Sequence, residues 1–191
     1  MFSRSVSLRL ILLATAWIVA ASLIGGVVLT RHFRTHVENS FDFGLLRHVE
    51  ELLSYAELVD DQVVLTQRPT DPSYLRPLSG WYWEIAVNGK VVERSRSLWD
   101  EVLPASTAIP KRGETLGYFY VGPLGERLRV VAATYSLPGH EGDVTIYFTG
   151  PAEVIEKALD EFRETLVMSL ALLGLGLIVA VVLQVILGLG A

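Results

Sequence analysis

The sequence predicts an α+β protein: two transmembrane helices flank one domain with a five- to six-stranded antiparallel sheet packed on a long N-terminal helix. Three observations predict this fold. Uncharged apolar stretches occupy residues 10–30 and 166–187, each long enough for the roughly 30 Å core of a bilayer. Apolar residues then recur every three to four positions over 31–59. In the middle of the chain the apolar period changes to two, which is typical of strands.

Composition and charge restrict the class of protein. Hydrophobic residues make up 51% of the chain, and the mean hydropathy is +0.41, too apolar for an ordinary soluble domain. Apart from Arg4 and Arg9, every charged residue lies between Arg31 and Glu164, where 14 Lys and Arg face 21 Asp and Glu. This net charge of −7 argues against nucleic acid as a partner and against binding of anionic lipid through a polybasic segment. The absence of cysteine excludes disulfides and thiolate sites.

Residues 1–9 form a short head that we expect in the cytoplasm, and residues 10–30 form the first span. A cleaved signal peptide is the competing interpretation, because small residues at 20–22 follow an apolar run. The run continues to residue 29, which favours an uncleaved anchor and a periplasmic middle domain at 31–165. Two pairs of small residues spaced four apart, Ala21 with Gly25 and Ser22 with Gly26, are candidates for a dimer contact.

The element that leaves the first span is predicted to be one helix over 31–59, with its apolar residues on one stripe. Asp60 and Asp61 close this helix, and residues 63–65 form a short strand. A loop containing Pro69, Pro72 and Pro77 follows.

A hairpin and a three-stranded meander complete the predicted sheet. Residues 81–87 alternate as a half-buried strand, Asn88-Gly89 is a strong hairpin turn signal, and residues 91–98 return as the partner strand. After a looser stretch over 99–112, strands are expected at 116–121, 127–135 and 143–149. A turn at 122–125 joins the first two of them.

From Pro151 a charged amphipathic helix leads without a break into the second span at 166–187. Such a helix would form a rigid rod between the sheet and whatever lies across the membrane. Residues 188–191 are expected to begin a cytoplasmic linker. We therefore expect the chain to be the input module of a signalling protein, without its output half.

This arrangement resembles the input half of a bacterial transmembrane sensor histidine kinase, with a PAS-like (PDC or PhoQ-type) periplasmic domain. Three stretches carry the resemblance. Residues 79–85 (SGWYWEI) resemble the first hairpin strand of one group of these kinases, residues 94–100 (RSRSLWD) resemble the segment leaving its partner, and residues 183–189 (LQVILGL) resemble the junction with a HAMP linker. No HAMP helices, phosphoacceptor histidine or ATP-binding domain follow in these residues.

The resemblance implies a two-component signalling protein of the inner membrane, homodimeric, that senses an ion, a small molecule or a protein outside the cytoplasm. ATP and magnesium would serve only the missing kinase domain, which would also meet the cognate response regulator. No cofactor is expected in this chain. Two alternatives remain open: the input module of a chemoreceptor or second-messenger cyclase, and a double-anchored scaffold that binds no ligand.

Candidate ligand residues lie on the hairpin and the meander. Arg94 and Arg96 could bind a carboxylate or stack on Trp81 and Trp83, although cross-strand pairs that stabilise the sheet would show the same pattern. The remaining ligand candidates share one face of a strand: Tyr118 and Tyr120.

Other chemistry finds little support in the sequence. His32 and His36 have metal-ligand spacing on a helix but no third ligand, while His48 and His140 are expected to be solvated. The aspartates considered as ligands of a divalent cation, Asp60, Asp61 and Asp71, lack calcium-loop spacing. No nucleophile elbow, zinc-protease or phosphate-loop motif is present, so no catalytic residue is predicted.

Overall fold

The computed structural model describes residues 2–59, 62–101, 103, 109–137 and 142–189. The chain divides into two compact units. A terminal unit consists of the first 37 residues together with those from Lys157 onward. A sheet unit consists of Glu38–Glu156 and carries most of the buried side chains.

Two long helices, α1 (Phe2–Ser54) and α2 (Glu153–Leu189), begin and end the fold. Each contains an apolar window long enough to cross a membrane, and none of either window is buried inside the protein. Large apolar side chains are exposed on the surface of the terminal unit: Trp17 is 75% exposed and Leu172 is 73% exposed. Such surfaces are unusual in water and are normal in lipid.

Within the terminal unit the two helices contact each other. The rings of Phe33 on α1 and Phe162 on α2 stack with centroids 3.8 Å apart. A Cβ built on Gly26 would lie only 3.2 Å from the side chain of Leu170, whereas one built on Gly25 would meet nothing within 4 Å. The small residue at position 26 therefore serves packing inside the chain. A dimer contact through these small residues stays a prediction.

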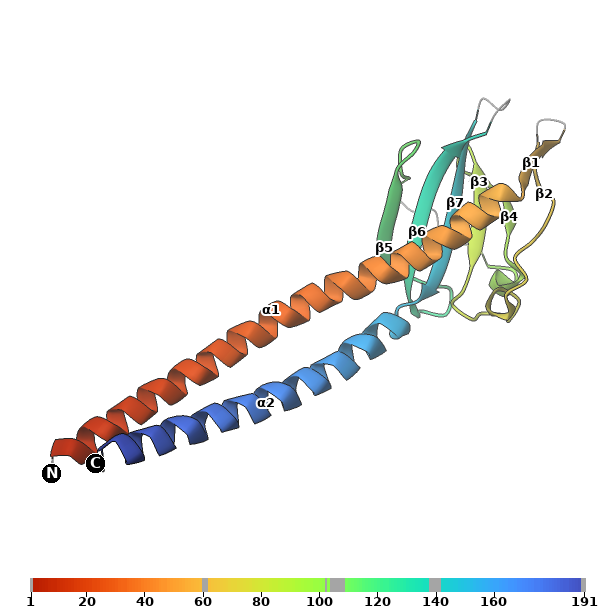
Figure 1. The fold of residues 1–191 in the computed structure, drawn as a ribbon. Helices are drawn as coiled ribbons and strands as arrows, with labels where there is room; N and C mark the ends of the chain where they lie inside the picture. The colour runs from red at the N-terminus through yellow and green to blue at the C-terminus, as the bar shows by residue number, and fades with distance from the viewer. Residues whose placement is uncertain (1, 60–61, 102, 104–108, 138–141, 190–191) are drawn as a thin grey trace. The chain divides into compact units, whose positions relative to one another are not determined.

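The sheet unit is built on a five-stranded antiparallel sheet with the order β4-β3-β7-β6-β5 (Figure 1). This confirms the predicted α+β fold with a sheet packed on the N-terminal helix. The predicted hairpin and meander are both present, and pairing of β3 with β7 joins them into one sheet. The strands are β3 (Trp83–Val87), β4 (Lys90–Arg94), β5 (Thr115–Val121), β6 (Arg127–Ser136) and β7 (Asp143–Pro151).

The end of α1 differs from the prediction. The helix stops at Ser54 rather than near residue 59, and a separate two-stranded hairpin follows, β1 (Ala56–Val59) with β2 (Gln62–Leu65). The backbone N–H of Thr66 donates to the carbonyl oxygen of Tyr55 and closes this hairpin at its base. The apolar residues over 56–59 predicted that the helix continues, but over four residues they fit an alternating strand pattern equally well. Pairing with β2 makes this segment a strand.

The β3–β4 hairpin turns where expected, with Asn88 and Gly89 both at positive φ, 50° and 78°. Its second strand is shorter than predicted. A register shift opposite the Ile85–Ala86 step distorts β4, which ends at Arg94 and is followed by a 3₁₀ turn, η2 (Arg96–Leu98). Bulged edge strands of this kind resist pairing with other chains.

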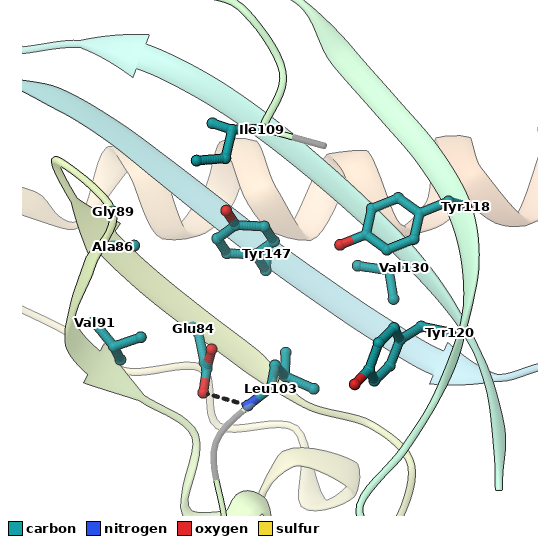
Figure 2. Close-up of a pocket in the computed structure, with 10 residues that line it drawn as sticks. All are labelled: Glu84, Ala86, Gly89, Val91, Leu103, Ile109, Tyr118, Tyr120, Val130 and Tyr147. Carbon is teal, nitrogen blue, oxygen red and sulfur yellow. Dashed lines mark hydrogen bonds between the residues drawn. The ribbon is translucent and has the colours of Figure 1, made fainter. Parts of the chain in front are cut away.

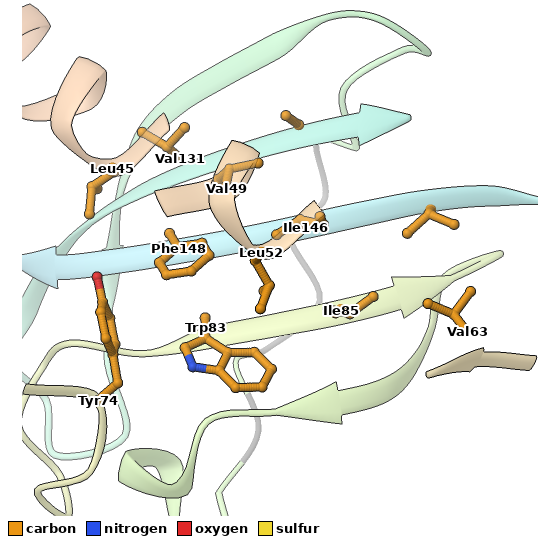
Figure 3. Packing of buried hydrophobic residues seen from close by; sticks show 12 residues of the cluster. Leu45, Val49, Leu52, Val63, Tyr74, Trp83, Ile85, Val131, Ile146 and Phe148 are labelled. Carbon is orange, nitrogen blue, oxygen red and sulfur yellow. The ribbon is translucent and has the colours of Figure 1, made fainter. Parts of the chain in front are cut away.

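The hydrophobic core lies between the last turns of α1 and one face of the sheet (Figure 3). Leu45, Val49 and Leu52 are spaced three and four apart, so they share one stripe of α1, and each is at most 2% exposed. Trp83 and Phe148 meet this stripe from the central strands. Because strand side chains alternate, the intervening residues of β3 and β7 point to the opposite face of the sheet.

A partly buried ion pair fastens α1 to the sheet. The guanidinium of Arg129 on β6 donates to both carboxylate oxygens of Asp42, from Nε at 2.7 Å and from Nη2 at 2.6 Å. Arg129 is 9% exposed, and it also lies over the ring of Phe119. A Cβ at Gly117 would collide with both charged groups, so glycine makes room for the pair on β5. We call this pair the α1 clamp.

Candidate functional site

A small pocket opens on the face of the sheet away from α1 (Figure 2). Its cavity volume is about 70 Å³, which is room for only about two to five water molecules. Strands β3 to β7 all contribute to its wall. The lining residues are Glu84, Ala86, Gly89, Val91, Leu103, Ile109, Tyr118, Tyr120, Val130 and Tyr147.

Glu84 on β3 is the charged group of this pocket. The residue is 2% exposed, and its Oε1 accepts a hydrogen bond from the backbone N–H of Leu103 at 2.9 Å. Burial raises the pKa of Glu84 to about 7, although the Leu103 hydrogen bond and the charge of Arg94 both act to lower it. The carboxyl group therefore titrates near neutral pH, whereas an exposed glutamate titrates at a much lower pH.

Three tyrosines face the same space as Glu84. Tyr118 and Tyr120 are two residues apart on β5, so their side chains share a face, and Val130 lies opposite Tyr118 on β6. Tyr147 on β7 lies directly opposite Glu84. Burial raises the pKa of Tyr147, as do the nearby groups Tyr118 and Glu84. Figure 2 shows the three phenol rings and the carboxyl group around one cavity.

Arg94 lies beside the acid on the same face of the sheet but is not among the residues that line the pocket. It is the register partner of Glu84 on the neighbouring strand, so the hairpin pairs the arginine with a glutamate and not with a tryptophan. Its Nη1 donates to the carbonyl oxygen of Glu101 at 2.8 Å. Arg94 therefore moderates the charge of Glu84 while anchoring the segment that leads to Leu103.

The predicted ligand residues do not form one site. Tyr118 and Tyr120 line the pocket, but Trp83 points into the core on the other face of the sheet and is 3% exposed. Trp81 packs against the rings of Phe41 and Tyr74, with centroids 5.8 Å and 6.3 Å away. The sixth candidate, Arg96, is exposed at the start of η2.

Glu84 and Tyr147 were missed at the level of sequence. The alternation over 81–87 predicts a half-buried strand, and this was wrong, because Trp83 to Ala86 are all buried. The face of Glu84 also carries Tyr82 and Ala86, and these flanking apolar residues are the signal that β3 is covered on both sides.

The histidines and aspartates considered as metal ligands have separate surroundings where the structure describes them. His32 and His36 are exposed on α1, and His48 packs on the rings of Tyr74 and Phe148. Asp71 accepts the backbone N–H of Ser73 and so begins a short 3₁₀ turn. Asp60, Asp61 and His140 lie outside the described residues. Among the residues that are described, no three His, Cys, Asp or Glu side chains are placed to hold a metal ion.

Comparisons with known proteins found no family model, no curated protein and no solved structure that matches this chain. The interpretation of the pocket therefore rests on its own chemistry. A buried carboxyl group among phenol rings can hold a proton, accept hydrogen bonds and attract a cation. The described lining thus offers one carboxyl group, three phenols and apolar side chains to a bound molecule.

Proposed function

We propose that the chain is the extracytoplasmic sensing module of a dimeric membrane receptor, in which α1 and α2 cross the bilayer and the sheet unit meets the signal. A two-component histidine kinase is the class of receptor that we favour. In that proposal residues 1–9 and 188–191 lie in the cytoplasm of a bacterium, and the sheet unit lies in the periplasm.

The observation that carries this proposal is the continuity of α2. Its first turn follows β7, a central strand of the sheet, and the same helix includes the apolar stretch that ends at Leu189. Ala152 and Ile155, at the start of the helix, are 0% and 2% exposed, so the helix is seated in the sheet unit before its apolar part begins. A change in the sheet can therefore bias the helix that would enter the membrane.

The arrangement of the elements also agrees with the resemblance to PAS-like sensor domains, which have a long helix, a central antiparallel sheet and a second helix in that order. A scaffold protein would need the anchors and the fold but no pocket. The buried acid in a cavity on the face of the sheet away from α1 is the specific feature that favours sensing over scaffolding.

Interrupting α2 should separate sensing from output. In a chimera that joins Leu189 to the HAMP linker and kinase core of a histidine kinase, we expect Lys157→Pro to abolish control of autophosphorylation by the signal. Proline removes an intrahelical hydrogen bond and costs about 3 kcal/mol in a helix interior. The measurement is autophosphorylation in membranes, at pH 5.5 and pH 8 and with added candidate ligands.

Lys157→Ala is the matched control, because it removes the same exposed side chain and keeps the helix. It should respond like the parent chimera. Equal regulation in the proline and alanine variants would show that α2 does not transmit the signal.

A further inference from the structure

We propose that the pocket of Glu84, Tyr118, Tyr120 and Tyr147 binds a small organic cation, a primary or methylated amine of about two to five heavy atoms. The proposal deepens the proposed function and rests on it in one respect: the amine would be the signal that the module senses. Binding itself is a property of the sheet unit and can be measured without any signalling output.

The sign of the ligand follows from the groups that face the cavity. Among the described residues that line the pocket, Glu84 of β3 is the only charged one, and the other polar side chains are the phenols of β5 and β7. Arg94 on β4 lies outside the lining, with its Nη1 engaged by Glu101. An anion would meet the buried carboxylate in the cavity, with the nearest cation, Arg94, outside the lining, whereas an ammonium group would neutralise that carboxylate.

Aromatic rings make this preference stronger. Phenol rings attract cations through their negative faces, and several rings around a carboxylate form the chemistry that recognises alkylammonium groups. Apolar side chains, among them Leu103, Ile109 and Val130, complete the wall and suit the alkyl part of such a ligand. A hard metal ion is a poorer fit, because it needs six or more oxygen ligands and the cavity offers one carboxylate.

The size of the ligand follows from the cavity. Sites for drug-sized molecules span roughly 300–1,000 Å³, several times the volume of about 70 Å³ found here. Sugars, nucleotides and long polyamines are therefore too large for it. Isopropylammonium, with four heavy atoms, has suitable probe dimensions and has a neutral isostere in 2-propanol.

The test uses the full chain in detergent micelles and isothermal titration at pH 8 with three probes: isopropylammonium, 2-propanol and isobutyrate. We expect saturable binding of the ammonium ion only. Glu84→Gln should weaken it by about tenfold or more, the value of a hydrogen-bonded charge. At pH 5 protons should compete for Glu84, and the affinity of the unaltered chain should fall by more than about tenfold.

Matched variants separate the site from general electrostatics. Glu93→Gln removes a carboxylate from β4 that pairs with Arg68 and does not line the pocket, so it should leave binding unchanged. Tyr147→Phe should keep most of the affinity, whereas Tyr147→Leu should lose roughly fivefold with its ring. Circular dichroism verifies that each variant is folded.

Three results would overturn the proposal: no binding of isopropylammonium by the folded chain, equal binding of 2-propanol or isobutyrate, or equal losses in the Glu84 and Glu93 variants. None of them would contradict membrane insertion or the transmission of a different signal through α2. Failure of the Lys157→Pro experiment, in turn, would leave binding of the amine intact.

Discussion

Between pH 5 and pH 8 the unaltered protein should lose about 2–3 kcal/mol of its free energy of unfolding, and replacing Glu84 with glutamine should abolish this loss. The folded protein holds the proton of Glu84 up to a pKa of about 7, while the ordinary value is 4.5. Between these two values the unfolded chain has released its proton and the folded chain has not. The free energy of unfolding therefore falls as pH rises through this window and levels off above about pH 7.

Urea unfolding of the full chain in micelles, followed by tryptophan fluorescence, measures this difference. Trp83 lies in the core and reports on unfolding of the sheet unit. The glutamine side chain can still accept the N–H of Leu103, so the variant should match the parent at pH 5 and exceed it at pH 8. Glu93→Gln should retain the parental slope. Parallel pH profiles for the parent and the Glu84 variant would refute a buried acid that titrates near neutrality.

The second large effect is expected at the α1 clamp. Asp42→Ala should destabilise the sheet unit by about 2–4 kcal/mol, because Arg129 stays charged at every accessible pH and would remain buried without its partner. Asp42 raises the pKa of Arg129 further, and the charge of Glu38 acts in the same direction. In the Asp42 variant the carboxylate of Glu38 would still stabilise the charge of Arg129, so we expect the loss of stability not to exceed the upper end of this range.

The matched control is the exposed ion pair of Arg112 and Asp143, whose side chains are 57% and 49% exposed. Arg112→Ala should cost less than about 1 kcal/mol, since solvent screens such pairs. In the double variant Asp42→Leu, Arg129→Met, apolar contacts replace the pair, and we expect it to be more stable than Asp42→Ala. A loss at Asp42 no larger than the loss at Arg112 would show that the clamp is not a significant anchor.

The fold was largely predictable because its signals are local. Asn88-Gly89 set the hairpin turn, and the period-two residues of β6 and β7 indicated strands that the structure extends by only one or two residues. The end of α1 was not predictable in this way. Residues 56–59 are too few to show whether their apolar residues follow a helical or an extended period. They form a strand because they pair with residues 62–65.

The site was predictable only in part, because it is assembled from non-local pairings. Tyr118 and Tyr120 could be placed on one face from their spacing alone, and the structure puts both in the pocket. Glu84 faces Tyr147 because β3 pairs with β7, sixty residues later in the chain, and no local signal specifies that register. Trp83 was a candidate as a conspicuous aromatic residue, but the same alternation that places Glu84 in the pocket turns Trp83 into the core.

In the proposed topology both apolar helices cross a membrane, and the sheet unit lies on one side of it. The protein has no cysteine, so single substitutions give unambiguous labelling sites. We would measure the reaction of an impermeant maleimide with Lys90→Cys, Leu172→Cys and Ser3→Cys in spheroplasts. Lys90 is exposed on the hairpin, and Leu172 lies within the apolar stretch of α2.

We expect the Lys90 variant to be labelled in intact spheroplasts, the Ser3 variant only after the membrane is permeabilised, and the Leu172 variant only after detergent solubilisation. Reaction of the Leu172 variant in intact spheroplasts, or labelling of Ser3 and Lys90 from the same side, would contradict this topology.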